Sequence, residues 1–247
     1  MNEPHIAAAY DRDLEAIQAM IMKMGGLVEA AIMSAATSLE TRDEELADRV
    51  RRNDRRVDEI EEQVNEEAAR VIALRAPMGP DLRTILTVMK ISANLERIGD
   101  YSNNMAKRTT VLVQMNPIGD TPRSIRRMAR EVEMMLKDAL DAYIQRDADR
   151  ARDVIERDRD VDQMYNALFR EFLTFMMEDP RNITGCMHLH FIAKNIERMG
   201  DHVTSIAEQV IYLVTGEIPD DVRWKDDQTS FETHGFDESE TGELRED

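Results

Sequence analysis

The chain has 247 residues and a net charge of −18, with only 10 glycines, 7 prolines and 5% aromatic residues. This composition, rich in Ala, Leu, Glu and Arg, predicts long helices and argues against sheets. The acidic charge argues against nucleic acid or an anionic lipid surface as the main ligand, and the single cysteine, Cys186, excludes an internal disulfide.

Prolines and two Arg-Asp dipeptides divide the chain into six predicted helices. A proline lacks the amide proton and restricts the residue before it, so helices should stop near the prolines at 77–80, 117–122, 180 and 219. The dipeptides at 42–43 and 146–147 supply two further joints. The predicted helices run near 8–41, 43–76, 80–115, 120–146, 148–178 and 181–215.

Apolar residues recur at alternating steps of three and four within these helices. The first helix carries Leu14, Ile17, Ile21, Met24 and Val28. The last carries Leu189, Ile192, Ile196, Met199, Val203, Ile206, Val210 and Leu213. Such regular seams predict an all-α fold of three-helix bundles with knobs-into-holes packing.

The two halves of the sequence resemble each other, which indicates an internal duplication. Residues 28–43 match 132–147 and residues 53–60 match 157–164 at an offset of 104, and "NLERIGDYSNNMA" from Asn94 matches "NIERMGDHVTSIA" from Asn195 at an offset of 101. We therefore expect two tandem three-helix bundles, 1–116 and 117–217, packed side by side or end to end. Residues 218–247 are acidic and poor in apolar residues, and we expect a disordered tail.

Four pairs of carboxylates spaced four residues apart occupy equivalent positions in the two halves. The pairs are Asp54 with Asp58, Glu96 with Asp100, Asp158 with Asp162, and Glu197 with Asp201. Each pair projects from one helix face, so the two pairs of a half could converge into an all-oxygen site for Fe, Mn, Mg or Ca. Ion pairing with local arginines such as Arg97 is an equally good interpretation.

Helix geometry predicts where these carboxylates face. At about 100° per residue, Glu197 and Asp201 point away from the apolar seam of their helix, so any cluster should be a surface patch open to water. Gly99 and Gly200 lie at matching places beside the seams, where close packing is the expected reason for a glycine. His202 follows Asp201 and is a weaker candidate ligand.

No phosphate-binding loop and no nucleophile with a matching base is recognisable in the sequence, which gives little reason to predict an enzyme. Two alternatives stay open: a metal-dependent hydrolase or oxidase that uses the carboxylate clusters, and a helical adapter without metal. The N-terminus lacks the pattern of a signal peptide and no run approaches 18 to 20 consecutive apolar residues, so we expect a cytoplasmic protein that does not insert into a membrane.

The segments "LERIGDYSNNMAKR" and "IERMGDHVTSIAEQVIYLVTGE", with "APMGPDLR" ahead of the first, resemble the PhoU family of regulators of bacterial phosphate uptake over residues 8–217. The resemblance implies two three-helix bundles, a cytoplasmic protein that is often a homodimer, and no catalytic activity. It also implies multinuclear iron or zinc clusters, or another divalent metal, on the bundle surface. The implied ligands are Asp54, Asp58, Glu96 and Asp100 in one half and Asp158, Asp162, Glu197 and Asp201 in the other.

Partners also follow from the resemblance. Members of the family act with the ATPase subunit of the phosphate ABC importer and with the phosphate sensor histidine kinase, and they repress the phosphate-starvation response when phosphate is plentiful. The second half has "DPRNIT" where the first has its Asp-Leu-Arg element, so the two sites need not be equivalent.

Overall fold

The computed structural model describes residues 3–219. All regular secondary structure in this part of the chain is helical, and it contains no strand. Its helices are α1 (Glu3–Thr41), α2 (Glu44–Asn53), α3 (Arg55–Arg75), α4 (Pro80–Leu112), α5 (Thr121–Gln145), α6 (Ala148–Glu178) and α7 (Ile183–Thr215), with a short 3₁₀ helix η1 (Pro180–Asn182) before α7. The all-α prediction is confirmed.

The two Arg-Asp joints form by the same local chemistry. Arg42 and Arg146 adopt left-handed backbone angles, with φ of 57° and 53°, and end α1 and α5. The next residue caps the following helix: the Asp43 carboxylate accepts the Leu46 amide at 2.9 Å, and Asp147 accepts two amides of α6. A capping carboxylate satisfies free N–H groups and complements the helix dipole. Both predicted joints are therefore confirmed.

The helix predicted over 43–76 is interrupted at Asp54, and that prediction is corrected here. The Val57 amide donates to the Asp54 carbonyl at 2.8 Å, a three-residue step where a regular helix uses four. No glycine or proline marks this tightened turn, which is why the sequence pattern missed it. The interruption falls on the first of the predicted site carboxylates.

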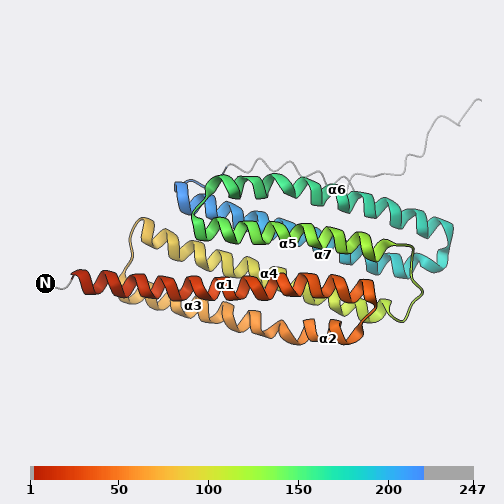
Figure 1. Ribbon diagram of the computed structural model, residues 1–247, viewed down its shortest axis with the longest axis horizontal. Coiled ribbons are helices and arrows are strands. Elements are labelled where there is room, and N and C mark those ends of the chain that lie inside the picture. The colour runs from red at the N-terminus through yellow and green to blue at the C-terminus, as the bar shows by residue number, and fades with distance from the viewer. Residues whose placement is uncertain (1–2, 220–247) are drawn as a thin grey trace, which may run out of the picture.

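The two bundles lie side by side, with α1 to α4 in one and α5 to α7 in the other (Figure 1). They meet where α4 packs on α7 and α1 packs on α5, and the buried apolar residues of both form one continuous cluster. At Gly25 of α1, a β-carbon would lie 2.4 Å from Cδ1 of Leu140 on α5, so the glycine permits the close approach of the two helices. The predicted domain division near 116–117 falls in the connection between α4 and α5, and most of the predicted tail lies outside the described residues.

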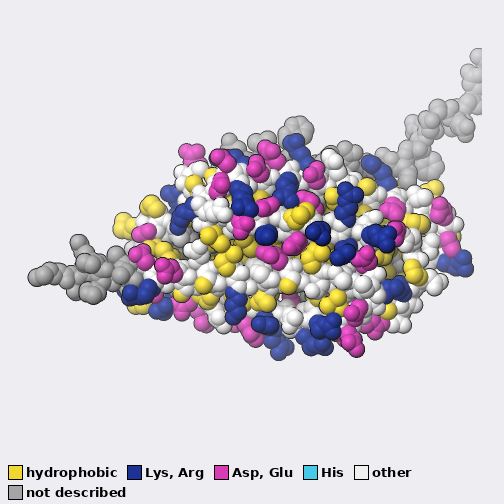
Figure 2. Space-filling model, in the orientation of Figure 1, with side chains coloured by type: hydrophobic (Ala, Val, Ile, Leu, Met, Phe, Trp, Pro, Cys, Tyr) yellow, Lys and Arg dark blue, Asp and Glu magenta, His cyan; other side chains and the backbone are white. Residues whose placement is uncertain are grey.

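One helix in the described part of the chain, α1, is long and apolar enough over Tyr10–Thr41 to cross a membrane by length and composition. The sequence prediction of no spanning run counted consecutive apolar residues and was too strict for this helix. Core helices of bundles pass the same test, and in α1 the seam residues Ile17, Ile21, Met24 and Val28 are buried. On the face seen in Figure 2, basic and acidic side chains are interspersed over both bundles.

Candidate functional site

The first bundle brings its four predicted carboxylates into one electrostatic cluster, which we call the first acidic patch: Asp54, Asp58, Glu96 and Asp100. Asp54 and Asp58 lie at the start of α3, and the other two lie one turn apart on α4. Burial, followed by the charge of Asp100, raises the pKa of Glu96 to about 7. Burial is also the first cause of the raised pKa values of Asp54 and Asp58, and the Asp100 charge adds to both. The four groups therefore repel one another at neutral pH.

Polar neighbours offset part of this repulsion. Arg97 reaches both carboxylates of α4, with Nε 3.5 Å from Glu96 Oε2 and a terminal nitrogen 3.6 Å from Asp100 Oδ2. The Arg97 side chain is 61% exposed, so water screens these contacts. Asn103 donates a hydrogen bond to the Asp54 carboxylate. The ion-pair interpretation thus holds for Arg97, while the cluster keeps an excess of negative charge.

The second bundle arranges its carboxylates differently. Asp162 on α6 and Glu197 on α7 are only 6% and 5% exposed. Lys194, one turn before Glu197, places Nζ 3.0 Å from Glu197 Oε1 and 4.9 Å from the ring centre of Tyr165. Within the described residues, Glu197 Oε2 is buried and has no hydrogen-bond partner. Burial, opposed by Lys194, raises the pKa of Glu197.

The prediction of a patch open to water is therefore wrong for the second half. It placed Glu197 by rotation relative to the seam of its own helix. However, α7 is packed by α4, α5 and α6, so the face away from the seam is covered as well. Glu197 lies on this covered face of α7, and Asp162 of α6 is buried as well, whereas Asp58 in the first half is exposed.

The repeated glycines bring the carboxylates of one helix against the backbone of another. A β-carbon on Gly99 would lie 3.5 Å from Asp54 Oδ1, and one on Gly200 would lie 2.9 Å from Asp158 Oδ1. A valine of the same helix completes each contact, Val57 in the first case and Val161 in the second. The packing role expected for both glycines is confirmed, and the group that packs there is a predicted site carboxylate.

Cys186, His188 and His202 lie against groups other than the first acidic patch. Cys186 is buried, and His188 Nδ1 lies 3.3 Å from a guanidinium nitrogen of Arg108. His202 Nδ1 lies 2.8 Å from Asn94 Oδ1, and its ring centre is 5.7 Å from that of Tyr101. Because both partners belong to α4, His202 contributes to the contact between the bundles.

The donors fit one kind of cation better than another. Among the described residues, no group of three or more His, Cys, Asp or Glu side chains is placed to hold one ion, so a closed zinc site does not fit. Mutually repelling carboxylates and the unpartnered Glu197 Oε2 fit a hard divalent cation that is held by one or two carboxylates and otherwise by water.

Two contributors escaped the sequence analysis: Asn103, which binds Asp54, and Lys194, which pairs with Glu197. Each lies three residues from a predicted carboxylate of its own helix. That spacing, which places two side chains on the same helix face, is the signal that could have found them.

The chain is similar to known proteins along most of its length. A family model described as "PhoU domain" matches twice, over residues 21–109 and 125–210, and the two matches start 104 residues apart and end 101 apart. A protein of Rhizobium meliloti named "Phosphate-specific transport system accessory protein PhoU homolog" is 43% identical over 230 residues, which are 93% of this chain and 97% of that protein. A protein of the same name from Caulobacter vibrioides is 44% identical over 86% of this chain and 93% of its own length.

Solved structures agree with these relatives. The crystal structure of PhoU from Pseudomonas aeruginosa has a TM-score of 0.81 to this chain at 37% identity, covering 84% of this chain and all of that one. The regulatory protein PhoU of the phosphate transport system from Streptococcus pneumoniae has a TM-score of 0.79 at 27% identity, covering 85% and 99%.

Proposed function

Because the chain belongs to the PhoU family, we propose that it is an accessory protein of phosphate-specific transport and regulates phosphate uptake. The observation that carries this proposal is the doubled family match, one over each bundle, together with relatives of that name that align along nearly their whole length.

The proposal extends to how the protein acts. It is a cytoplasmic adapter, active as a homodimer, that binds the ATPase subunit of the phosphate importer and the sensor histidine kinase and represses the starvation response when phosphate is plentiful. It acts by binding and not by catalysis. The two bundles differ in their electrostatics, because one has an excess of negative charge and the other pairs the buried Glu197 with the partly exposed Lys194. This difference supports separate surfaces for separate partners.

A divalent cation is part of the proposal. One or two carboxylates of each set would hold it, with water completing its shell: the first set is Asp54, Asp58, Glu96 and Asp100, and the second is Asp158, Asp162, Glu197 and Asp201. When bound, the cation supplies positive charge that relieves the repulsion among these carboxylates. The raised pKa values of Asp54 and Glu96 and the buried Glu197 Oε2 support this assignment.

The function is tested by deleting the gene and restoring it in trans. We expect the deletion strain, grown in phosphate-rich medium, to express phosphate-starvation genes and to take up excess labelled phosphate, and the restored gene to reverse both effects. Purified protein should also retain the importer ATPase and the sensor region of the kinase in a pull-down at high phosphate. Unchanged uptake and expression in the deletion strain, with neither partner retained, would refute the proposal.

A further inference from the structure

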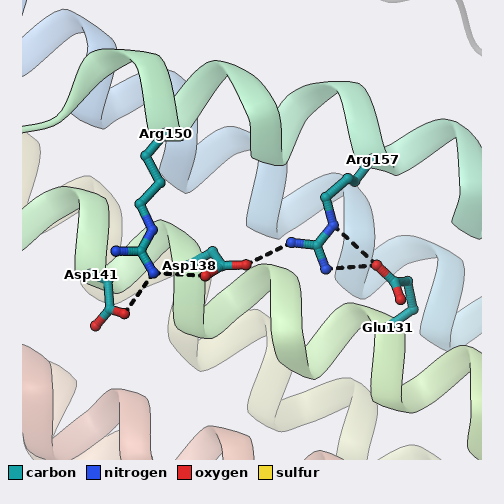
Figure 3. A network of polar contacts seen from close by, with 5 residues as sticks. All are labelled: Glu131, Asp138, Asp141, Arg150 and Arg157. Carbon is teal, nitrogen blue, oxygen red and sulfur yellow. Dashed lines mark hydrogen bonds and ion pairs between the residues drawn. The ribbon is translucent and has the colours of Figure 1, made fainter.

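A network of ion pairs bridges α5 and α6 in the part of the second bundle near their connection (Figure 3). Arg157 reaches from α6 to Glu131 Oε1 at 2.7 Å and to Asp138 Oδ2 at 2.6 Å. Arg150, in the first turn of α6, contacts Asp138 Oδ1 at 2.8 Å and Asp141 Oδ2 at 2.9 Å. Two arginines from one helix are thus held by three carboxylates from the other, with Asp138 between them.

The first bundle has none of these charges at the equivalent positions. The offset of 104 places Leu27 opposite Glu131, Ser34 opposite Asp138, Thr37 opposite Asp141, Leu46 opposite Arg150 and Asn53 opposite Arg157. Instead of a network, the structure has an open pocket of about 150 Å³ at this place, between α1 and α2. Its walls include Leu27, Ala31, Ser34, Leu46, Val50 and Asn53. At these equivalent positions one bundle thus has ion pairs and the other has an open pocket, while the larger hollow between α5 and α6, of about 600 Å³, lies farther along these helices, beyond Glu131.

The size and lining of this pocket, which we call the α1–α2 pocket, limit what it can hold. Sites for drug-sized ligands and cofactors have volumes of about 300–1,000 Å³, so this pocket is too small for a nucleotide. Most of its lining residues are aliphatic. Leu27 and Leu46 are partly exposed there, which leaves apolar surface in contact with water. A single apolar side chain fits these properties.

Charge at the edge of the pocket indicates what accompanies that side chain. Asp54 lines the pocket and belongs to the first acidic patch, with Asp58 and Asp100 nearby. Arg49 also lines the pocket; its pair with Glu45, at 3.9 Å, is largely exposed, so water screens it. In the second bundle the ammonium group of Lys194 lies against Glu197, but the equivalent residue of the first bundle, 101 positions earlier, is Ala93. Arg97 lies beside Glu96 and Asp100, and Lys107 is near Asp54, so two cations face four carboxylates in the first acidic patch. A further cation next to the α1–α2 pocket would supply the charge that Ala93 does not.

We propose that the α1–α2 pocket is a docking site for a helical segment of a partner protein, which inserts one apolar side chain and places a lysine or arginine, one turn away, against the first acidic patch. The inference adds to the proposed function the surface where a partner binds. It rests on the proposed function for the identity of that partner, but not for the existence of the site. Apolar burial supplies affinity, and the carboxylates favour basic partners over acidic ones.

The test uses the full chain with labelled methyl groups and two short helical peptides. The peptides share one exposed leucine and differ only one turn away, where one has lysine and the other glutamate. NMR titrations are run with a chelator, because a divalent cation at the first acidic patch would compete with the lysine. We expect the lysine peptide to shift the methyl signals of Leu27, Leu46, Val50 and Val57. The glutamate peptide should bind at least about tenfold more weakly. Shifts confined to other methyl groups, or equal affinities of the two peptides, would overturn the inference.

Two variants close the pocket in independent ways. The first copies the second bundle by combining Leu27→Glu, Ser34→Asp, Leu46→Arg and Asn53→Arg, and the second is Ala30→Trp, a single change at an exposed position of the lining. Each should weaken binding of the lysine peptide about tenfold or more. The matched control is Met134→Trp, which lies at the position equivalent to Ala30 in the second bundle and should leave the affinity unchanged.

The outcomes separate this inference from the proposed function. If the importer ATPase binds the wild-type protein and the folded Ala30→Trp variant equally well and that variant also keeps its affinity for the lysine peptide, the inference fails and the function stands. If the peptide binds in the pocket but the deletion strain regulates phosphate uptake normally, the site stands and the proposed function fails. Circular dichroism and thermal unfolding establish that each variant is folded.

Discussion

Asp158 presses on the backbone of α7 at Gly200: a β-carbon at that glycine would lie 2.9 Å from the Asp158 Oδ1 atom. The matching contact in the first bundle is looser, because a β-carbon on Gly99 would lie 3.5 Å from Asp54 Oδ1, an ordinary contact. The duplication thus kept one packing arrangement and tightened it in one copy.

This difference predicts different responses to alanine at the two glycines. Gly99→Ala should raise the free energy of unfolding by up to about 1 kcal/mol, because alanine favours a helix interior over glycine and the added methyl group has room. Gly200→Ala should raise the free energy of unfolding less than Gly99→Ala does, by at least about 0.5 kcal/mol, because the Asp158 carboxylate must move away from the added methyl group. Urea unfolding of the two variants measures the difference, and equal gains would contradict the packing described here.

Glu96 should make stability depend on pH. Its pKa of about 7 in the folded protein exceeds the ordinary value of 4.5, so the native state holds the proton more tightly than the unfolded state does. The contribution is complete below pH 4.5 and is lost as the pH rises through about 7. Because Glu96 is partly exposed and lies near Arg97, we expect a loss of about 1 kcal/mol.

The variant Glu96→Gln lacks this titration and should lose less stability than the wild type over the same pH range. Chemical unfolding at several pH values, in the presence of a chelator, measures it. Glu156→Gln, at an exposed carboxylate, is the control and should change stability by less than about 0.5 kcal/mol throughout. Parallel curves for the wild type and Glu96→Gln would show that Glu96 is not perturbed.

Glu197 provides the test of cation binding in the second bundle. A ligand that binds only the native state stabilises it by about 2.7 kcal/mol at one hundred times its dissociation constant, so Mn²⁺ or Fe²⁺ should raise the thermal midpoint of the wild type. Glu197→Gln keeps the shape of the side chain but removes the charge, and it should lower both the shift and the metal content measured by mass spectrometry. A wild-type midpoint that is the same with metal and with chelator would argue for carboxylates that serve ion pairing alone.

Arg157 should contribute more to stability than the exposed arginines do. It donates three hydrogen bonds to the carboxylates of Glu131 and Asp138, and hydrogen bonds to charged groups contribute about 1.5–3 kcal/mol. Partial exposure reduces this, so we expect Arg157→Ala to cost about 1–2 kcal/mol. The control, Arg152→Ala, removes a pair with Asp149 in which the side chains are 52% and 93% exposed, and it should cost less than about 0.5 kcal/mol. Equal costs for the two variants would mean that the network in Figure 3 does not hold α5 and α6 together.

Local sequence chemistry determined the helices, the joints and the duplication. The capping aspartates Asp43 and Asp147, the seam residues of α1 and α7, and the two glycines beside the carboxylate motifs could all be predicted, because capping, periodicity and glycine packing depend on residues within a few turns. The internal duplication also predicted that the four carboxylate pairs divide into two sets, one in each half of the chain.

Only the tertiary structure decided how buried those sets are and what lies beside them. The face of α7 that carries Glu197 is away from its own seam, yet it is covered because three other helices pack around α7. The α1–α2 pocket exists because side chains from two helices fail to meet there, while Arg150 and Arg157 bridge the equivalent surface of the second bundle. A periodic pattern reports which side of one helix is apolar, but burial and cavities depend on how the surfaces of several helices fit together.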